Sequence, residues 1–93
     1  MSRAKRVRGA ATRGAVVSIV HPRGGLKMKR AIVVGAGARD AYSRAYGKQI
    51  LVCDLKHGAS ISEVGAGDAI VHGRVKKMPK ACRIALAEYK KGG

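Results

Sequence analysis

Apolar residues along this chain occur in short runs that are separated by glycine-rich or basic segments. The runs are rich in small and β-branched residues, which is typical of β-strands. Five of them predict strands: 14–20, 30–35, 49–54, 68–75 and 81–88. The last run is also compatible with a short helix, because its Ala, Leu and Glu residues favour helix. The residues between the third and fourth runs, 57–68, are expected to form turns and a tight glycine-rich bend.

Five short strands joined by basic loops predict an all-β fold, a small closed barrel with a basic N-terminal arm. The five-stranded oligonucleotide-binding barrel (OB-fold) is one such architecture. We expect this domain at residues 14–89, after a basic N-terminal extension at 1–13 and before a basic C-terminal tail at 90–93. The extension lacks apolar periodicity and acidic residues, so it is expected to run along nucleic acid as an arm; its composition also fits a retained targeting segment.

The core of this domain must be thin. The chain has 93 residues, with no Trp, no Phe and three Tyr, so Val, Ile, Leu and Ala have to form it. A domain of this size buries only roughly 60–65% of the surface that its unfolded chain exposes. Such a fold is expected to gain order from a partner.

The net charge indicates what that partner is. Twenty Lys and Arg residues against five Asp and Glu give a formal charge of +15. This exceeds the roughly 2–8 charges that keep a small domain soluble, and it favours a polyanionic ligand, with nucleic acid first. A membrane is not expected as a partner, because no long amphipathic helix and no apolar run of about 20 residues is visible.

One stretch imitates a dinucleotide-binding motif. Residues 32–37, Ile-Val-Val-Gly-Ala-Gly, resemble a strand that enters a phosphate-binding turn, and Asp54 lies about twenty residues later. However, the third glycine position of the motif is Asp40, and the helix that could follow is too short for a crossover. We therefore expect no nucleotide cofactor and no small-molecule substrate.

Other enzyme and metal signatures are missing from the sequence. The three histidines are scattered, and no Ser or Cys lies in a recognisable nucleophile context. Cys53 and Cys82 form no Cys-x-x-Cys pair, and both lie in apolar runs, so they are expected to be buried thiols. The chain is therefore predicted not to be an enzyme and to hold no metal.

Several motifs occur in the order and spacing of a known family. They are Gly14-Ala-Val-Val-Ser18, Lys29-Arg30-Ala-Ile-Val-Val34, Tyr46-Gly47-Lys48, Asp54, Val64-Gly65 to Gly67-Asp68, and Ile70, Arg74, Lys80, Arg83 and Ile84. Over residues 14–88 the chain resembles the small-subunit ribosomal protein seventeen family of bacterial and organellar type. Departures from the family pattern at 53–55 and 74–78 indicate a diverged, organellar member.

The resemblance implies a five-stranded barrel that binds small-subunit rRNA, helps it fold early in assembly and contacts neighbouring ribosomal proteins. It favours the mitochondrial matrix, with the plastid or the bacterial cytoplasm as alternatives. The other open possibility is a free-standing basic nucleic-acid-binding protein, cold-shock-like or DNA-compacting. Such a protein would be expected to carry more aromatic residues on its sheet.

Recognition is expected to rely on phosphates and shape, because structured RNA offers few readable base edges and the chain has few stacking rings. Arginines are the stronger candidates, since they can contact phosphate through two parallel hydrogen bonds. The residues predicted to contact RNA are Arg3, Lys5, Arg6, Arg8, Arg13, Lys27, Lys29, Arg30, Tyr46, Lys48, Arg74, Lys76, Lys77, Lys80 and Arg83.

Overall fold

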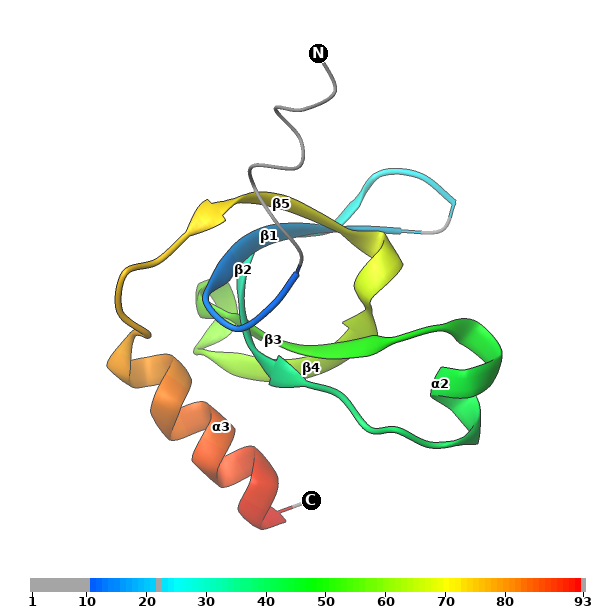
Figure 1. Ribbon diagram of the computed structural model, residues 1–93. Helices are drawn as coiled ribbons and strands as arrows, with labels where there is room; N and C mark the ends of the chain where they lie inside the picture. The colour runs from blue at the N-terminus through cyan, green and yellow to red at the C-terminus, as the bar shows by residue number, and fades with distance from the viewer. Residues whose placement is uncertain (1–10, 22, 93) are drawn as a thin grey trace.

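The protein is a curled five-stranded antiparallel sheet with one long helix against its outer face (Figure 1). The computed structural model describes residues 11–21 and 23–92. In chain order the elements are β1 (Ala15–Val20), β2 (Leu26–Ala36), α2 (Ala41–Tyr46), β3 (Gln49–Asp54), the 3-10 turn η1 (Leu55–His57), β4 (Ser60–Gly65), the 3-10 turn η2 (Ala66–Asp68), β5 (Ala69–Arg74) and α3 (Lys80–Gly92). Of the predicted all-β, five-stranded fold, the coarser part is confirmed: the chain is mostly β, with a five-stranded antiparallel sheet. No helix in the described ranges is long and apolar enough to cross a membrane.

The strand order explains the curl. The order across the sheet is β4-β3-β2-β1-β5, so β4 and β5 lie at opposite edges. Only the three residues of η2 join these two strands, and the sheet therefore bends until its edges approach each other at that point. Between the described residues of β4 and β5, however, no ladder forms. The prediction of a closed barrel is wrong: the sheet is curled but open.

Both faces of the sheet are covered by apolar side chains. An inner cluster draws on all five strands: Ala15, Val17, Ile19, Ala31, Val33, Ile50, Val52 and Val64, with Ala69 and Val71 partly buried. An outer cluster lies between the sheet and α3: Ile32, Val34, Leu51, Cys53 and Cys82. Successive strand residues point to opposite faces, so a strand buried on both sides reads as a continuous apolar run.

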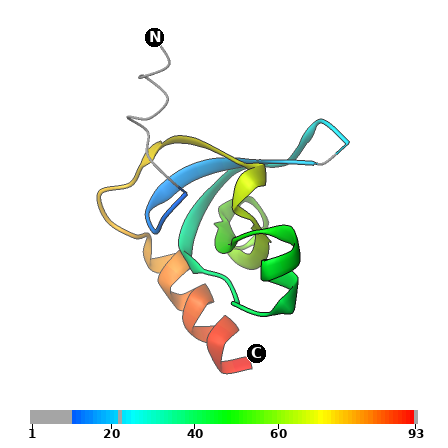
Figure 2. The same cartoon turned by 45° about the vertical axis from the view of Figure 1, so that its right-hand side comes forward.

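Residues 81–88 form most of α3 and not a fifth strand, which corrects the prediction for this run and the all-β class. Cys82 is buried and Ala85 and Leu86 are partly buried in the outer cluster, which is the spacing of one helical face. Ile84, which alternation would place beside Cys82 and Leu86, is 49% exposed. High helix propensity and helical spacing together outweigh the alternation. Figure 2 shows α3 outside the curled sheet, as Figure 1 does.

The predicted turn region 57–68 contains β4, and this prediction is also wrong in part. β4 pairs with β3 along its whole length, from Gln49 with Gly65 to Asp54 with Ser60. Val64 is the one buried residue of β4. An edge strand with a single buried side chain has a weak apolar pattern, and this is why the sequence resembles a turn.

Candidate nucleic-acid interface

Three of the five acidic side chains accept hydrogen bonds from nearby backbone N–H groups. Asp40 accepts from the Ser43 amide at 3.1 Å and caps α2, while Ser43 Oγ accepts from the Asp40 amide. Asp54 caps η1 by accepting from the Lys56 amide at 3.0 Å. Glu63 accepts from the Ala38 amide at 2.7 Å. These carboxylates stabilise local backbone structure. The Lys and Arg residues of the described ranges, which outnumber the acids, lie on the surface.

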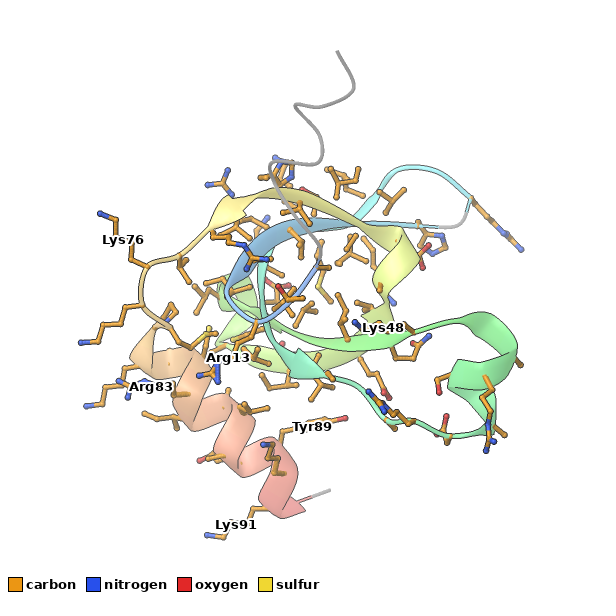
Figure 3. The ribbon with its side chains drawn as sticks, viewed as in Figure 1. Arg13, Lys48, Lys76, Arg83, Tyr89 and Lys91 are labelled. Atoms are coloured by element: carbon orange, nitrogen blue, oxygen red, sulfur yellow. The ribbon has the colours of Figure 1, made fainter. Side chains whose placement is uncertain are left out.

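The largest group of bases lies on and just before α3. This α3 basic surface consists of exposed residues only: Lys76, Lys77, Lys80, Arg83, Lys90 and Lys91. With 3.6 residues per turn, the four bases within α3 fall in an arc of roughly 100°, and the helix from Lys80 to Lys91 is about 16 Å long. Figure 3 shows Lys76, Arg83 and Lys91 projecting away from the sheet, whereas Tyr89 lies on the other flank of α3.

The linker between β5 and α3 is anchored so that its lysines point outward. The Val75 amide donates to the Gly14 carbonyl at 2.9 Å, and the side chains of Val75 and Met78 pack against the outer cluster. Lys76 and Lys77 lie between these two anchors and are exposed. The anchored linker thus leads directly into α3 and leaves both lysines exposed.

Arg74, also a predicted RNA contact, has a structural role in addition to its charge. Its guanidinium donates to Oγ1 of Thr12 at 2.6 Å and to the carbonyl of Arg13 at 3.2 Å. Arg74 therefore fixes the chain that leads into β1 onto the end of β5.

A second group of bases lies on β2 and η1. Lys27, Lys29 and Arg30 line a shallow depression of about 340 Å³ together with Lys56, which was not predicted. We call these four residues the β2–η1 basic surface. Arg30 and Lys56 also border a neighbouring depression of about 380 Å³, next to the exposed side chain of Leu55. Lys56 was missed because it lies between the predicted strand 49–54 and the predicted turns 57–68 and belongs to neither.

A third group lies between α2 and the start of β3. Lys48 lines a groove of about 630 Å³ with Arg39 and Arg44, neither of which was predicted as a contact. Arg13 lines an adjoining depression of about 190 Å³, which Lys48 also borders. The Asp40-x-x-Ser43 spacing is a helix-start signal that would have placed Arg44 on a short helix.

The remaining predicted RNA contacts lie outside the part of the chain that the structure describes. Arg3, Lys5, Arg6 and Arg8 fall outside the described residues, as does the side chain of Tyr46. All the other predicted basic residues are exposed. Apart from Arg74, they are divided among three surfaces, to which the structure adds Arg39, Arg44, Lys56, Lys90 and Lys91.

The glycine-rich stretch that imitates a nucleotide-binding turn has a packing explanation. The Gly37 amide donates to the Gln49 carbonyl at 2.8 Å. A Cβ at Gly37 would lie 2.8 Å from Cβ of Gln49 and would also clash with Oε2 of Glu63. Gly37 is therefore required by the close approach of two chain segments.

The two cysteines are unmodified and fully buried, one on each side of the contact between the sheet and α3. Burial, with a smaller contribution from a hydrogen bond to the Cys82 thiol, raises the pKa of Cys53 to about 12. A neutral, buried thiol is a packing group and neither a nucleophile nor a ready metal ligand. Within the described ranges, no three His, Cys, Asp or Glu residues cluster as a metal site would require.

Comparisons of the chain with protein-family models, with curated proteins and with solved structures found no match.

Proposed function

We propose that this protein binds structured RNA through the α3 basic surface, as a structural constituent of the ribosomal small subunit. The observation that carries the proposal is the group of six exposed bases on α3 and its linker, of which the four on α3 share one face of the helix. Lys and Arg residues that neutralise phosphates release condensed counterions, and this release supplies most of the affinity for nucleic acid. An anchored helix presents these charges at fixed spacing.

The chemistry of the surface favours recognition of shape over stacking. Tyr89 is the aromatic residue whose side chain is described, and it lies on the flank of α3 away from the bases. Arg83 can form two parallel hydrogen bonds to one phosphate, whereas the lysines act as point charges. These properties suit the phosphates and 2′-hydroxyls of a folded RNA.

The ribosomal assignment rests on the resemblance of residues 14–88 to the small-subunit ribosomal protein seventeen family. With it come small-subunit rRNA and neighbouring ribosomal proteins as partners, the mitochondrial matrix as the favoured location, and a structural role without catalysis or cofactor. The OB-fold assignment belongs to the same proposal. It is supported by a five-stranded antiparallel sheet that curls around one inner cluster.

Salt-dependent RNA binding tests the α3 basic surface. Fluorescence anisotropy with a labelled RNA duplex is measured over a salt series for the wild type, for Arg83→Gln, and for the matched variant Arg23→Gln on the β1–β2 hairpin. Each lost phosphate contact lowers the slope of log affinity against log salt by about 0.7–0.9. We expect Arg83→Gln to lower the slope by nearly one such step and Arg23→Gln to change it little. Equal effects of the two variants would refute a site on α3.

Sedimentation tests the ribosomal assignment. A lysate is separated on a sucrose gradient in low and in high salt, and the chain is followed by mass spectrometry. Co-migration with the small subunit in both conditions is expected. Recovery only in free fractions, or with DNA, would refute the assignment and favour the free-standing nucleic-acid binder.

A further inference from the structure

A groove lies between β2, α2 and β3. The small residues Ala36, Gly37 and Ala38 form its floor, Arg39, Arg44 and Lys48 supply its positive charge, and Ser43 and Gln49 also line it. All three bases are exposed. We call this region the α2 groove. A floor without large side chains allows a sugar–phosphate backbone to approach the protein closely.

The groove continues beyond Lys48. The adjoining depression shares Ala36 and Lys48 with it and extends to Thr12 and Arg13. Four bases thus follow one path, from Arg44 and Arg39 past Lys48 to Arg13. A continuous path suits a polymer with repeated phosphates better than a single small anion.

The carboxylates next to this path are engaged with backbone groups. Glu63 accepts from the Ala38 amide beneath the groove, and Asp40 accepts from the Ser43 amide at the start of α2. Both acids therefore help to build the groove: one fixes its floor, and the other fixes the helix that carries Arg44.

The α2 groove and the α3 basic surface are separate. They share no residue, and α2 and α3 lie on different sides of the curled sheet in both Figure 1 and Figure 2. In Figure 3 Lys48 lies at the start of β3, away from Lys76 and Arg83, whereas Arg13, at the far end of the path, lies near the start of α3. The part of the groove next to α2 is therefore the part that an RNA bound along α3 leaves free.

We propose that the α2 groove is a second binding site for RNA backbone, so that one molecule holds two RNA segments together. This inference rests on the proposed function, because it takes RNA as the ligand of the α3 basic surface. It adds a site with its own residues and a bridging role. Arg39 and Arg44 are its main phosphate contacts, and Lys48 and Arg13 extend it.

A bridging assay tests this site with the full chain. Two RNA duplexes, one with a donor and one with an acceptor fluorophore, are mixed with protein, and energy transfer between them is measured. A bridge between two RNAs gives transfer that rises and then falls as protein is added, because excess protein occupies each RNA separately. The wild type is expected to show the maximum.

The variants separate the two sites. Arg39→Gln/Arg44→Gln is expected to bind a single duplex with an affinity within about twofold of that of the wild type. Its energy transfer between the two duplexes is expected to fall by about tenfold or more, because each lost charge-assisted hydrogen bond weakens the binding of RNA in the groove. The control Arg23→Gln, on the β1–β2 hairpin and outside the three basic surfaces, is expected to retain bridging. Wild-type bridging by Arg39→Gln/Arg44→Gln, or an equal loss in Arg23→Gln, would overturn the second site and leave the proposed function intact. A wild type that binds no RNA in the anisotropy experiment would overturn both.

Discussion

The guanidinium of Arg74 at the end of β5 donates a hydrogen bond of 2.6 Å to Oγ1 of Thr12, just before β1. A second hydrogen bond, of 3.2 Å, goes from the same guanidinium to the carbonyl of Arg13. Next to it, the Val75 amide donates to the Gly14 carbonyl. The beginning of the described chain is therefore fastened to the sheet at the point where β5 leads into the α3 linker.

This relationship predicts that Arg74→Ala is destabilising as well as less basic. Loss of the two hydrogen bonds should lower the free energy of unfolding by about 1–2 kcal/mol. Arg83→Ala removes the same charge from the exposed face of α3 and should change it by less than about 0.5 kcal/mol. Urea unfolding of both variants and the wild type measures the difference. Equal stabilities of the two variants would contradict a structural role for Arg74.

Ser18 provides a second prediction. It is buried, its Oγ donates to the Lys29 carbonyl at 2.6 Å, and it lies 2.5 Å from Nε2 of His72. Because the single hydroxyl proton is used on Lys29, Nε2 of His72 must be the donor to Ser18. Ser18→Ala removes both hydrogen bonds and should cost about 1–2 kcal/mol.

The control for this prediction is Ser60→Ala, at an exposed position of β4, which should change the free energy of unfolding little. Thermal unfolding of both variants gives the comparison. A Ser18→Ala variant as stable as Ser60→Ala would show that the hydroxyl does not contribute to the packing of β1, β2 and β5.

Gly37→Ala is expected to disturb the floor of the α2 groove. The new Cβ would lie 2.8 Å from Cβ of Gln49 and 3.0 Å from its carbonyl carbon, and it would also clash with Glu63. Crowding of this kind costs about 1–3 kcal/mol. The matched variant Gly67→Ala meets nothing within 4 Å and should be neutral or slightly stabilising. Equal melting temperatures for the two variants would rule out the close approach.

The Cys53 thiol predicts a loss of stability in alkali. Burial raises its pKa from 9.0 to about 12, so the folded protein keeps a proton that the unfolded chain releases. The free energy of unfolding should therefore fall as the pH rises from about 9 towards about 12, by at most about 1.4 kcal/mol per pH unit from this group. In Cys53→Ala this contribution is absent. Urea unfolding at several alkaline pH values should show a shallower decline for the variant, and parallel declines would contradict the assignment.

Most strands that were predicted correctly are those whose buried residues follow one another directly in the sequence. β1, β3 and the apolar centre of β2 are continuous apolar runs because both faces of the sheet are covered. β4 was missed because an edge strand with one buried residue has little pattern. In α3 the alternation of residue types was misleading, whereas the spacing of Cys82, Ala85 and Leu86 would have indicated a helix.

Charged side chains are expected at the surface, so the exposure of the predicted bases could be inferred from the sequence. Which of these bases lie near one another in the fold could not. Arg39 and Arg44 join Lys48 only because β2 and β3 pair on either side of α2. Lys56 meets Lys29 and Arg30 only because η1 follows β3, which lies beside β2. Lys90 and Lys91, expected in a tail, share a helical face with Lys80 and Arg83. Such groupings depend on contacts between distant residues, which local patterns do not encode.

The pairing of Ala15 with Arg74 has a consequence for synthesis on the ribosome. The hairpins that join β1 to β4 can form in the order in which they emerge, but the outer edge of β1 has no partner until β5 has been made. During that interval the nascent chain displays an open strand edge, which is a template for pairing with other chains. The sheet is complete only when β5, the last of its five strands to be translated, reaches β1.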